Sequence, residues 1–294
     1  LQGDYRSLFR GSGIDLANLR EYRDGDDIRY IDWNVTARSD TLHVREYQED
    51  RELTAWFLLD LSPSVEFASD AVSKRMVLAE FVGVMARLLI GKGNHCGAVL
   101  FSGGVDRVIP PRGGRRQVLH LLDLLASRPR LVRSPATDLG AILGRAANII
   151  RRHSSVFVVS DFISKPGWER PLGLLARRHD VVAIRLFDPS ETRIPDLGLL
   201  AFQDAETGEQ IFVDTNDRSF RRRFMRAAQQ QQDELRAAFS RVGVDCLELS
   251  TEDDLLDAFS RFAQLRKQRY RGALGATLPN TAALSPVSAP GVGS

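Results

Sequence analysis

The sequence predicts an α/β protein with a doubly wound, mostly parallel β-sheet of the Rossmann type and an irregular N-terminal segment. Three observations carry this prediction: short continuous apolar runs recur along the chain, they alternate with segments of helical periodicity, and two of the runs end in a carboxylate. Strands that are apolar on both faces belong to parallel sheets covered by helices on both sides. The 294 residues suffice for one large domain of this kind or for two modest ones.

The predicted strands and helices alternate through the main part of the chain. The first strand lies in LTAWFLLD, and SKRMVLAEFVGVMARLLIGKG then has helical spacing and ends in glycines, which stop helices. Further buried strands are predicted in the runs HCGAVLFS, SSVFVVSDF and DVVAIRLFD, with a shorter strand in VDRVIPP. Amphipathic helices are predicted in RRQVLHLLDLLASR and DLGAILGRAANIIRR. This alternation predicts right-handed crossovers between parallel strands.

The later part of the chain is more polar. LLAFQDAETGEQIFVD predicts a hairpin around Thr207 and Gly208, and the long charged helix that follows it ends at Gly243. VDCLELS predicts a last strand, and a final helix follows with Thr251 as its expected cap. We therefore expect an N-terminal segment over residues 1–52, a main domain over 53–271 with the hairpin and long helix inserted near 197–242, and a disordered tail over 272–294.

The composition excludes several classes of protein. The net charge is +2, with 40 basic and 38 acidic residues, so the chain lacks the basic excess of a nucleic-acid-binding protein. Two cysteines exclude a disulfide scaffold and favour the cytoplasm. No run reaches the roughly 18 apolar residues of a membrane span, and no signal peptide is visible. The sequence begins with Leu1 rather than Met, so it does not exclude a further segment before Leu1.

Five oxygen-bearing side chains are expected at one edge of the sheet. Asp60 and Asp161 each end an apolar run, and ligands bind where the carboxyl ends of parallel strands meet. Ser62 and Ser64 follow Asp60 in an Asp-x-Ser-x-Ser motif, and Thr137 precedes a helix that starts near the same edge. Carboxylates and hydroxyls, without thiolate or imidazole, favour hard cations. The set predicts a divalent cation, first Mg²⁺ and otherwise Mn²⁺ or Ca²⁺, with an open position for a partner's Asp or Glu.

These residues allow two other interpretations. Asp60 and Ser62 are also residues that cap helices, so they could simply begin the next helix. A hydrolase or phosphatase could use Asp60 or Ser62 as its nucleophile. However, phosphatases with an aspartyl intermediate usually carry a second Asp at the position of Ser62, and no motif brings a histidine to serve as base. We therefore expect a protein that is not an enzyme.

Two motifs resemble known families. The Asp-x-Ser-x-Ser motif at Asp60, followed by Thr137 and Asp161, resembles the metal-ion-dependent adhesion site of von Willebrand factor A domains, and the predicted strand order is similar to that fold. The segment GSGIDLANLREYRDGDDIRYIDWNVTARSDTLHVREYQEDRE resembles the signature of the bacterial family called domain of unknown function 58. The resemblance covers about residues 10–270. Val65 stands where family members often have Met, and this apolar exchange leaves the expected ligands intact.

The resemblance also implies partners. Family members mostly lie beside genes for MoxR-type AAA+ ATPases, so it implies an adaptor or co-chaperone that works with such an ATPase on a client protein complex. The N-terminal segment is a possible docking surface, with the candidate residues Arg20, Arg23, Asp26, Asp27, Arg29, Asp32, Trp33 and Arg38. Its structural alternative is a salt-bridged segment with Trp33 packed on the core. A third interpretation keeps the fold, treats the metal site as vestigial and assigns binding to this segment.

Overall fold

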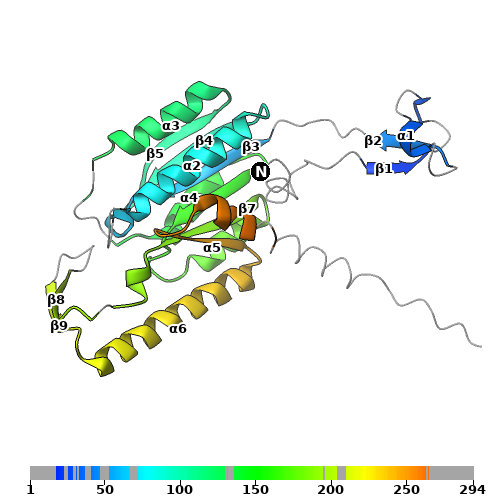
Figure 1. Cartoon of the computed structure of the whole chain (residues 1–294). Helices are drawn as coiled ribbons and strands as arrows, with labels where there is room; N and C mark the ends of the chain where they lie inside the picture. The colour runs from blue at the N-terminus through cyan, green and yellow to red at the C-terminus, as the bar shows by residue number, and fades with distance from the viewer. Residues whose placement is uncertain are drawn as a thin grey trace, which may run out of the picture.

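A six-stranded sheet forms the centre of the molecule (Figure 1). The computed structural model describes residues 18–22, 26–28, 31, 33–36, 41–46, 53–66, 72–129, 131, 136–194, 196–203, 210–262 and 264. The sheet order is β10-β7-β6-β3-β4-β5, and every neighbouring pair is parallel except β4 with β5. Its strands are β3 (Thr54–Asp60), β4 (His95–Phe101), β5 (Val105–Arg112), β6 (Ser155–Ser160), β7 (Asp180–Phe187) and β10 (Asp245–Ser250). The predicted doubly wound, mostly parallel sheet is confirmed.

Helices cover both faces of this sheet, as Figure 1 shows for α2 and α3 on one side and α6 on the other. One face is covered by α2 (Lys74–Ile90), α3 (Arg115–Ser127) and the helical residues 255–262. The opposite face is covered by α4 (Leu139–Ile149), α5 (Glu169–Ala176) and α6 (Arg218–Val242). The short α5 was not predicted from the sequence, because eight residues give little periodicity.

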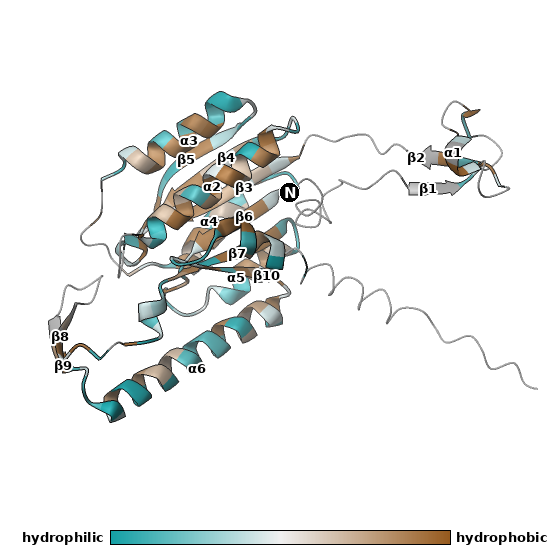
Figure 2. Cartoon of the chain, viewed as in Figure 1, coloured by the Kyte–Doolittle hydropathy of each residue, from teal (hydrophilic) through white to brown (hydrophobic). Residues whose placement is uncertain are grey.

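The core divides into two layers because successive strand residues point to opposite faces of the sheet. In β3, Phe57 packs in the layer under α2, and Trp56 packs in the layer under α4. The Phe57 ring stacks on Phe157 of β6 at 5.4 Å and meets Phe81 of α2 edge-on at 6.4 Å. Figure 2 shows the apolar strands between these helices. Burial of both faces explains why the strands appear in the sequence as continuous apolar runs.

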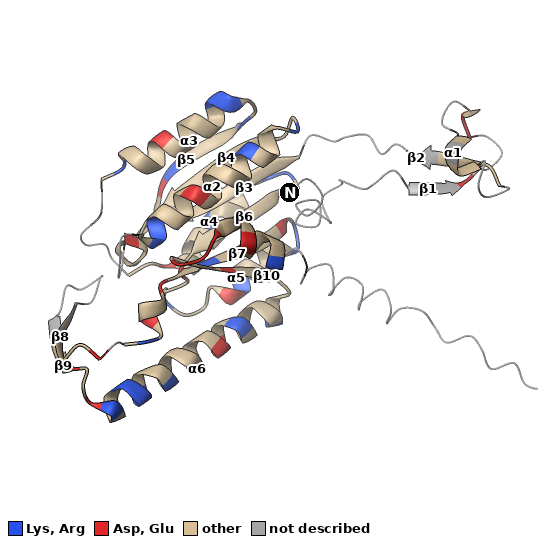
Figure 3. Cartoon of the chain, viewed as in Figure 1, with Lys and Arg blue, Asp and Glu red and all other residues tan. Residues whose placement is uncertain are grey.

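The connection from β7 to β10 runs through the hairpin β8 (Leu199–Gln203) and β9 (Gln210–Asp214) and then through α6. The hairpin leaves Leu199 and Phe212 largely exposed. In α6, Ala238 and Phe239 are buried against the sheet, whereas basic residues dominate the first half of the helix (Figure 3). The helix therefore serves as the crossover to β10, and its charged part faces solvent.

Two local predictions need correction. Asp254, rather than Thr251, caps the last helix, because Asp254 Oδ1 accepts hydrogen bonds from the backbone amides of Leu256 and Asp257. Trp33 does not pack on the core, since its side chain is 66% exposed. Trp33 begins the short helix α1 (Trp33–Thr36), which lies in sequence between the paired strands β1 (Asn18–Glu21) and β2 (His43–Glu46).

Within the described ranges, no helix is both long and apolar enough to cross a membrane.

Candidate cation-binding site

Four of the five predicted oxygen residues lie at the carboxyl end of the central strand or of its neighbour β6. β3 pairs with β4 on one side and with β6 on the other, and the helices that follow β3 and precede β6 cover opposite faces of the sheet. This arrangement is a topological switch point, where ligands bind in open α/β sheets. Asp60 is the last residue of β3, and Asp161 directly follows β6. The pairing of these strands therefore brings the two carboxylates to the same edge.

The turn after β3 directs oxygen atoms inward. Asp60 is fully buried, and its Oδ1 accepts a hydrogen bond of 3.0 Å from the backbone N–H of Ser62. Ser62 and Ser64 are also buried, and their Oγ atoms lie 3.0 Å apart. Ser64 belongs to the 3₁₀ helix η3 (Pro63–Glu66), which places the two hydroxyls on the same side. The Asp-x-Ser-x-Ser spacing thus gathers one carboxylate and two hydroxyls at one point.

The helix-cap interpretation of these residues is wrong. The helix after this turn begins at Lys74, and its cap is Ser73, which accepts a hydrogen bond from the backbone N–H of Met76. Asp60 and Ser62 lie more than ten residues earlier and bond within their own turn. They therefore do not cap α2.

Thr137 has an unsatisfied hydroxyl. The neighbouring residue Asp138 caps α4 through a 2.9 Å hydrogen bond from the backbone N–H of Ala141, so Thr137 is not needed as a cap. The carbonyl of Thr137 accepts a hydrogen bond from the backbone N–H of Lys165, which ties Thr137 to the loop that follows Asp161. Thr137 Oγ1 is buried, and among the described residues it has no hydrogen-bond partner. A buried hydroxyl without a partner is costly, which is consistent with a ligand position.

The turn after β6 is held in a strained conformation. Phe162 has φ 59°, a left-handed conformation that is uncommon for residues other than glycine. Its ring packs 4.9 Å from Phe239 and 5.4 Å from Trp168, and its backbone N–H donates to Ser160 Oγ. Strain of this kind persists where the surroundings over-determine it, often at functional sites. Here it fixes the direction of Asp161, whose Oδ1 accepts from the N–H of Ile163.

Three residues that sequence reasoning missed complete this edge. Ser160 Oγ donates a 2.5 Å hydrogen bond to Asp60 Oδ2, which joins the β6 turn to the β3 turn. Lys74 Nζ lies 2.9 Å from Asp161 Oδ2 and 2.6 Å from Glu191 Oε1, although Lys74 is only 1% exposed. Glu191 ends the 3₁₀ helix η4 (Pro189–Glu191) that follows β7. No local sequence signal marks Lys74 or Glu191, because their partners are distant in the chain.

A fourth residue, Asp188, was also missed, although the sequence did carry a signal for it. It follows the apolar strand β7 as Asp161 follows β6. It is fully buried, and its Oδ1 accepts from the backbone N–H and hydroxyl of Ser190, while its Oδ2 accepts from Thr251 Oγ1. Protein donors therefore satisfy Asp188 on both oxygens.

Burial makes the ionised form of the carboxyl groups at this edge costly. Burial, and then the negative charge of Asp161, raise the pKa of Asp60 to about 7, although hydrogen bonds from Ser160 and Ser62 oppose the rise. Burial also raises the pKa of Glu191, against the attraction of Lys74. For Lys74, burial lowers the pKa, but Asp161 and Glu191 outweigh it and the pKa is raised. A cation bound beside Asp60 would offset the cost of its buried charge.

These residues fit a hard divalent cation. The ligand atoms available are carboxylate and hydroxyl oxygens, which suit Mg²⁺, Mn²⁺ or Ca²⁺ rather than softer metals. The part of the chain that the structure describes contains no group of three or more His, Cys, Asp or Glu side chains arranged to bind a metal. Hydroxyls of Ser62, Ser64 and Thr137, together with water, would therefore have to supply the remaining ligands.

The predicted docking residues of the N-terminal segment are only partly described. Arg20 lies in β1, opposite Val44 of β2. Asp26 and Asp27 are partly buried, and Trp33 is exposed. The other candidates, Arg23, Arg29, Asp32 and Arg38, lie outside the described residues, as does the tail over 272–294. The role of this segment stays a prediction.

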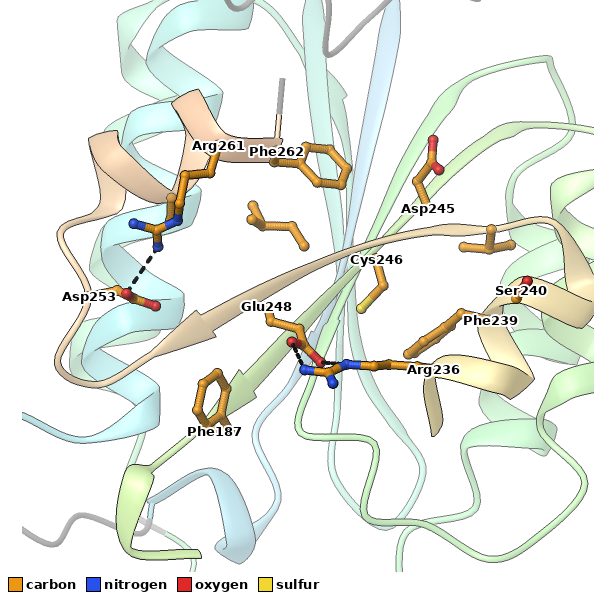
Figure 4. Close-up of a pocket in the computed structure, with 13 residues that line it drawn as sticks. Phe187, Arg236, Phe239, Ser240, Asp245, Cys246, Glu248, Asp253, Arg261 and Phe262 are labelled. Atoms are coloured by element: carbon orange, nitrogen blue, oxygen red, sulfur yellow. Dashed lines mark hydrogen bonds and ion pairs between the residues drawn. The ribbon is translucent and has the colours of Figure 1, made fainter. Parts of the chain in front are cut away.

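A separate hollow of about 580 Å³ lies beside the edge strand β10 (Figure 4). Four of its charged groups pair with one another, because Arg236 bonds Glu248 at 2.8 Å and Arg261 bonds Asp253 at 3.0 Å. None of the five predicted oxygen residues lines it. We place the candidate site at the carboxylates of the sheet edge, because unbalanced charge and an unsatisfied hydroxyl occur there.

The strand order, with one antiparallel edge strand and an oxygen-rich carboxyl edge, defines a von Willebrand factor A-like fold. The family described as "Protein of unknown function DUF58" matches residues 18–234. The relative named "Uncharacterized protein Rv1480", from Mycobacterium tuberculosis, is 34% identical over 274 residues, which are 93% of this chain and 85% of that protein. "Uncharacterized protein YeaD" of Bacillus subtilis is 31% identical over 112 residues, 37% of this chain and 25% of that protein. The chain belongs to the DUF58 family.

Two solved structures from Bacteroides are similar to most of the chain. The "conserved hypothetical protein BatB" from Bacteroides thetaiotaomicron is 13% identical, with a TM-score of 0.48 over 74% of this chain and 99% of that chain. An "aerotolerance-related membrane protein" from Bacteroides fragilis is also 13% identical, with a TM-score of 0.45 over 75% and 99%. The fold assignment therefore rests on the strand order, and the site rests on its own residues.

Proposed function

We propose that this chain is a non-enzymatic protein-interaction module that depends on a divalent metal ion. The first candidate for this ion is Mg²⁺. The observation that carries the proposal is the buried set of Asp60, Ser62, Ser64 and Asp161 at one edge of the sheet, together with the buried hydroxyl of Thr137, which has no hydrogen-bond partner among the described residues. Asp60, Ser62, Ser64, Thr137 and Asp161 would hold the cation, some of them through water. A bound cation would supply an open coordination position for an acidic side chain of a partner.

The contacts of the two possible nucleophiles favour binding over catalysis. Ser62 Oγ has a serine hydroxyl as its neighbour, and among the described residues no histidine bonds to it. Both carboxylate oxygens of Asp60 already accept hydrogen bonds within the protein. A nucleophilic serine needs an adjacent base, and a nucleophilic aspartate needs an accessible oxygen. The hydrolase alternative therefore lacks the group that it most requires.

The partner that we propose is a MoxR-type AAA+ ATPase in the cytoplasm, with a client protein complex whose assembly or maturation the pair supports. Membership of the DUF58 family and the match of the N-terminal signature support this choice. The cation edge would bind an acidic residue of the ATPase or of the client.

Calorimetric titration with Mg²⁺ and Mn²⁺ tests the metal part of the proposal. Wild type should bind one cation per chain, and Asp60→Ala should bind none, because it removes a carboxylate at the centre of the site. Saturable binding that is equal in both proteins, or absent from both, would overturn the metal-dependent function.

Capture of the ATPase by the immobilised chain tests the partner part. Binding in Mg²⁺ that disappears in EDTA supports recognition through the cation. Binding that EDTA leaves unchanged would instead assign recognition to the N-terminal segment and make the metal site vestigial.

A further inference from the structure

Lys74 occupies a position that is unfavourable for a cation. It is the first residue of α2, where the helix dipole presents its positive end, and it is almost fully buried. Burial of an ammonium group is costly unless it is paired and hydrogen-bonded. The compensation comes from Asp161 at 2.9 Å and Glu191 at 2.6 Å. The position of Lys74 therefore depends on the carboxylates of the candidate cation site.

The charges in this cluster act on any divalent cation bound there. Asp60, Asp161 and Glu191 contribute three carboxylates, and Lys74 contributes one ammonium group. These four groups carry more negative than positive charge when all are ionised. Asp188 on the next strand end is a further buried carboxylate, and its oxygens accept hydrogen bonds from neutral donors. A divalent cation at this edge would therefore be attracted by the carboxylates and repelled by Lys74.

We propose that Lys74 and Glu191 set the affinity of the site for its divalent cation, Lys74 by weakening it and Glu191 by strengthening it. The inference rests on the proposed function, because it concerns the same site. The ammonium group of Lys74 repels any metal ion that contacts Asp161, and it already bonds one oxygen of the Asp161 carboxylate. Glu191 attracts the cation and is 26% exposed in its side chain, so it lies at the rim of the site. Charges in a buried cluster are weakly screened by solvent and salt.

This arrangement would also keep the site folded when no metal is bound. Lys74 balances Asp161 and Glu191 when no other cation is bound. Without Lys74, two buried or partly buried carboxylates would face each other, and the protein would need a metal ion to offset their repulsion. Lys74 thus lowers the affinity for the metal ion, but it allows the site to release and rebind the ion without unfolding.

Calorimetric Mg²⁺ titration of three variants tests the inference. Lys74→Met should bind Mg²⁺ at least about tenfold more tightly than wild type, because one repelling charge is removed from a weakly screened cluster. Glu191→Gln should bind about tenfold more weakly, because one attracting charge is removed. Lys165→Met is the matched control: it removes the same charge from an exposed side chain near Thr137, and its affinity should stay within about twofold of wild type.

The outcomes separate this inference from the proposed function. If wild type binds Mg²⁺ but neither Lys74→Met nor Glu191→Gln shifts the affinity as stated, the inference is wrong and the metal function stands. If only Lys74→Met binds Mg²⁺, Lys74 fills the site in wild type, which supports the inference and contradicts the proposed function. If no protein binds, both are overturned. If Lys74→Met does not fold by circular dichroism, Glu191→Gln decides: unchanged affinity refutes the inference.

Discussion

The two central carboxylates, Asp60 and Asp161, are almost equally buried but are balanced in different ways. Asp60 receives hydrogen bonds from neutral donors, the Ser62 amide and the Ser160 hydroxyl. Asp161 forms an ion pair with Lys74 and also accepts a hydrogen bond from the backbone N–H of Ile163. Neutral donors stabilise a buried carboxylate less than a cation does. Consistently, the pKa of Asp60 is raised to about 7 by burial and by Asp161.

This difference assigns separate roles to the two turns. Asp161 and Lys74 hold the edge of the sheet together when no metal is bound, and they need each other for that. Asp60 is the group with unbalanced charge, so a divalent cation would gain most from contact with Asp60. The comparison predicts that changes on the Asp161 side affect stability as well as metal binding, whereas changes on the Asp60 side affect mainly metal binding.

The largest stability loss is expected for Asp161→Asn. The substitution keeps the shape of the side chain but removes one of the two charges that neutralise buried Lys74. Breaking one side of a buried ion pair costs about 3 kcal/mol or more. Urea denaturation in EDTA measures this loss.

Asp60→Asn is the matched control, because it also exchanges one buried carboxylate for an amide. Its expected loss in EDTA is below about 1 kcal/mol, since neutral hydrogen bonds can be largely retained. Equal losses in the two variants would contradict the division of roles.

The second prediction concerns the pH dependence of stability. Because the pKa of Asp60 is raised from 3.8 to about 7, the folded state binds this proton more tightly than the unfolded state does. The resulting stabilisation is fully present below about pH 4 and is lost as the pH rises to about 7. Wild type in EDTA should therefore lose roughly 3 kcal/mol relative to Asp60→Asn across this range.

Denaturation series of both proteins at several pH values measure this difference. Saturating Mg²⁺ should reduce it, because a bound metal favours the ionised carboxylate. Parallel stability curves for wild type and Asp60→Asn in EDTA would show that Asp60 is not the unbalanced group.

A smaller effect is expected for Ser160→Ala. The Ser160 hydroxyl donates to Asp60 Oδ2 and accepts from the N–H of Phe162, so its loss leaves two buried groups with one partner fewer. The expected cost is about 1–2 kcal/mol in thermal or urea unfolding. Ser240→Ala, which changes an exposed hydroxyl on α6, is the comparison variant. A cost for Ser160→Ala no larger than that for Ser240→Ala would remove Ser160 from the site.

The sheet was predictable from the sequence because its strands are buried on both faces. Phe57 and Trp56 point to opposite layers, yet both are apolar, so β3 appears as one continuous run. The long helix α2 was predictable from its spacing and from the glycines at its end. The predicted cap of the last helix was wrong because Thr251 and Asp254 are both good capping residues. The hydroxyl of Thr251 instead donates to Asp188, and this contact depends on the tertiary fold.

The positions of Asp60 and Asp161 were predictable for a related reason: each directly follows an apolar run. Their partners were not. Lys74 contacts groups 87 and 117 residues further along the chain, and a lysine at a helix start gives no sign that it is buried. Asp188 could have been found by the rule that found Asp161, since it follows β7. Position in the sheet is thus readable from sequence, whereas the balance of charge requires the structure.

The most direct test of the central claim is a calorimetric Mg²⁺ titration of wild type and Thr137→Val. Thr137 Oγ1 has no hydrogen-bond partner within the described residues, so replacing the hydroxyl by a methyl group should leave stability in EDTA unchanged or slightly higher. If Thr137 is a cation ligand, the affinity for Mg²⁺ should fall by about tenfold or more. We predict saturable binding of one Mg²⁺ by wild type and this weaker binding by Thr137→Val. No binding by wild type, or equal affinity in the two proteins, would contradict a cation site at this edge.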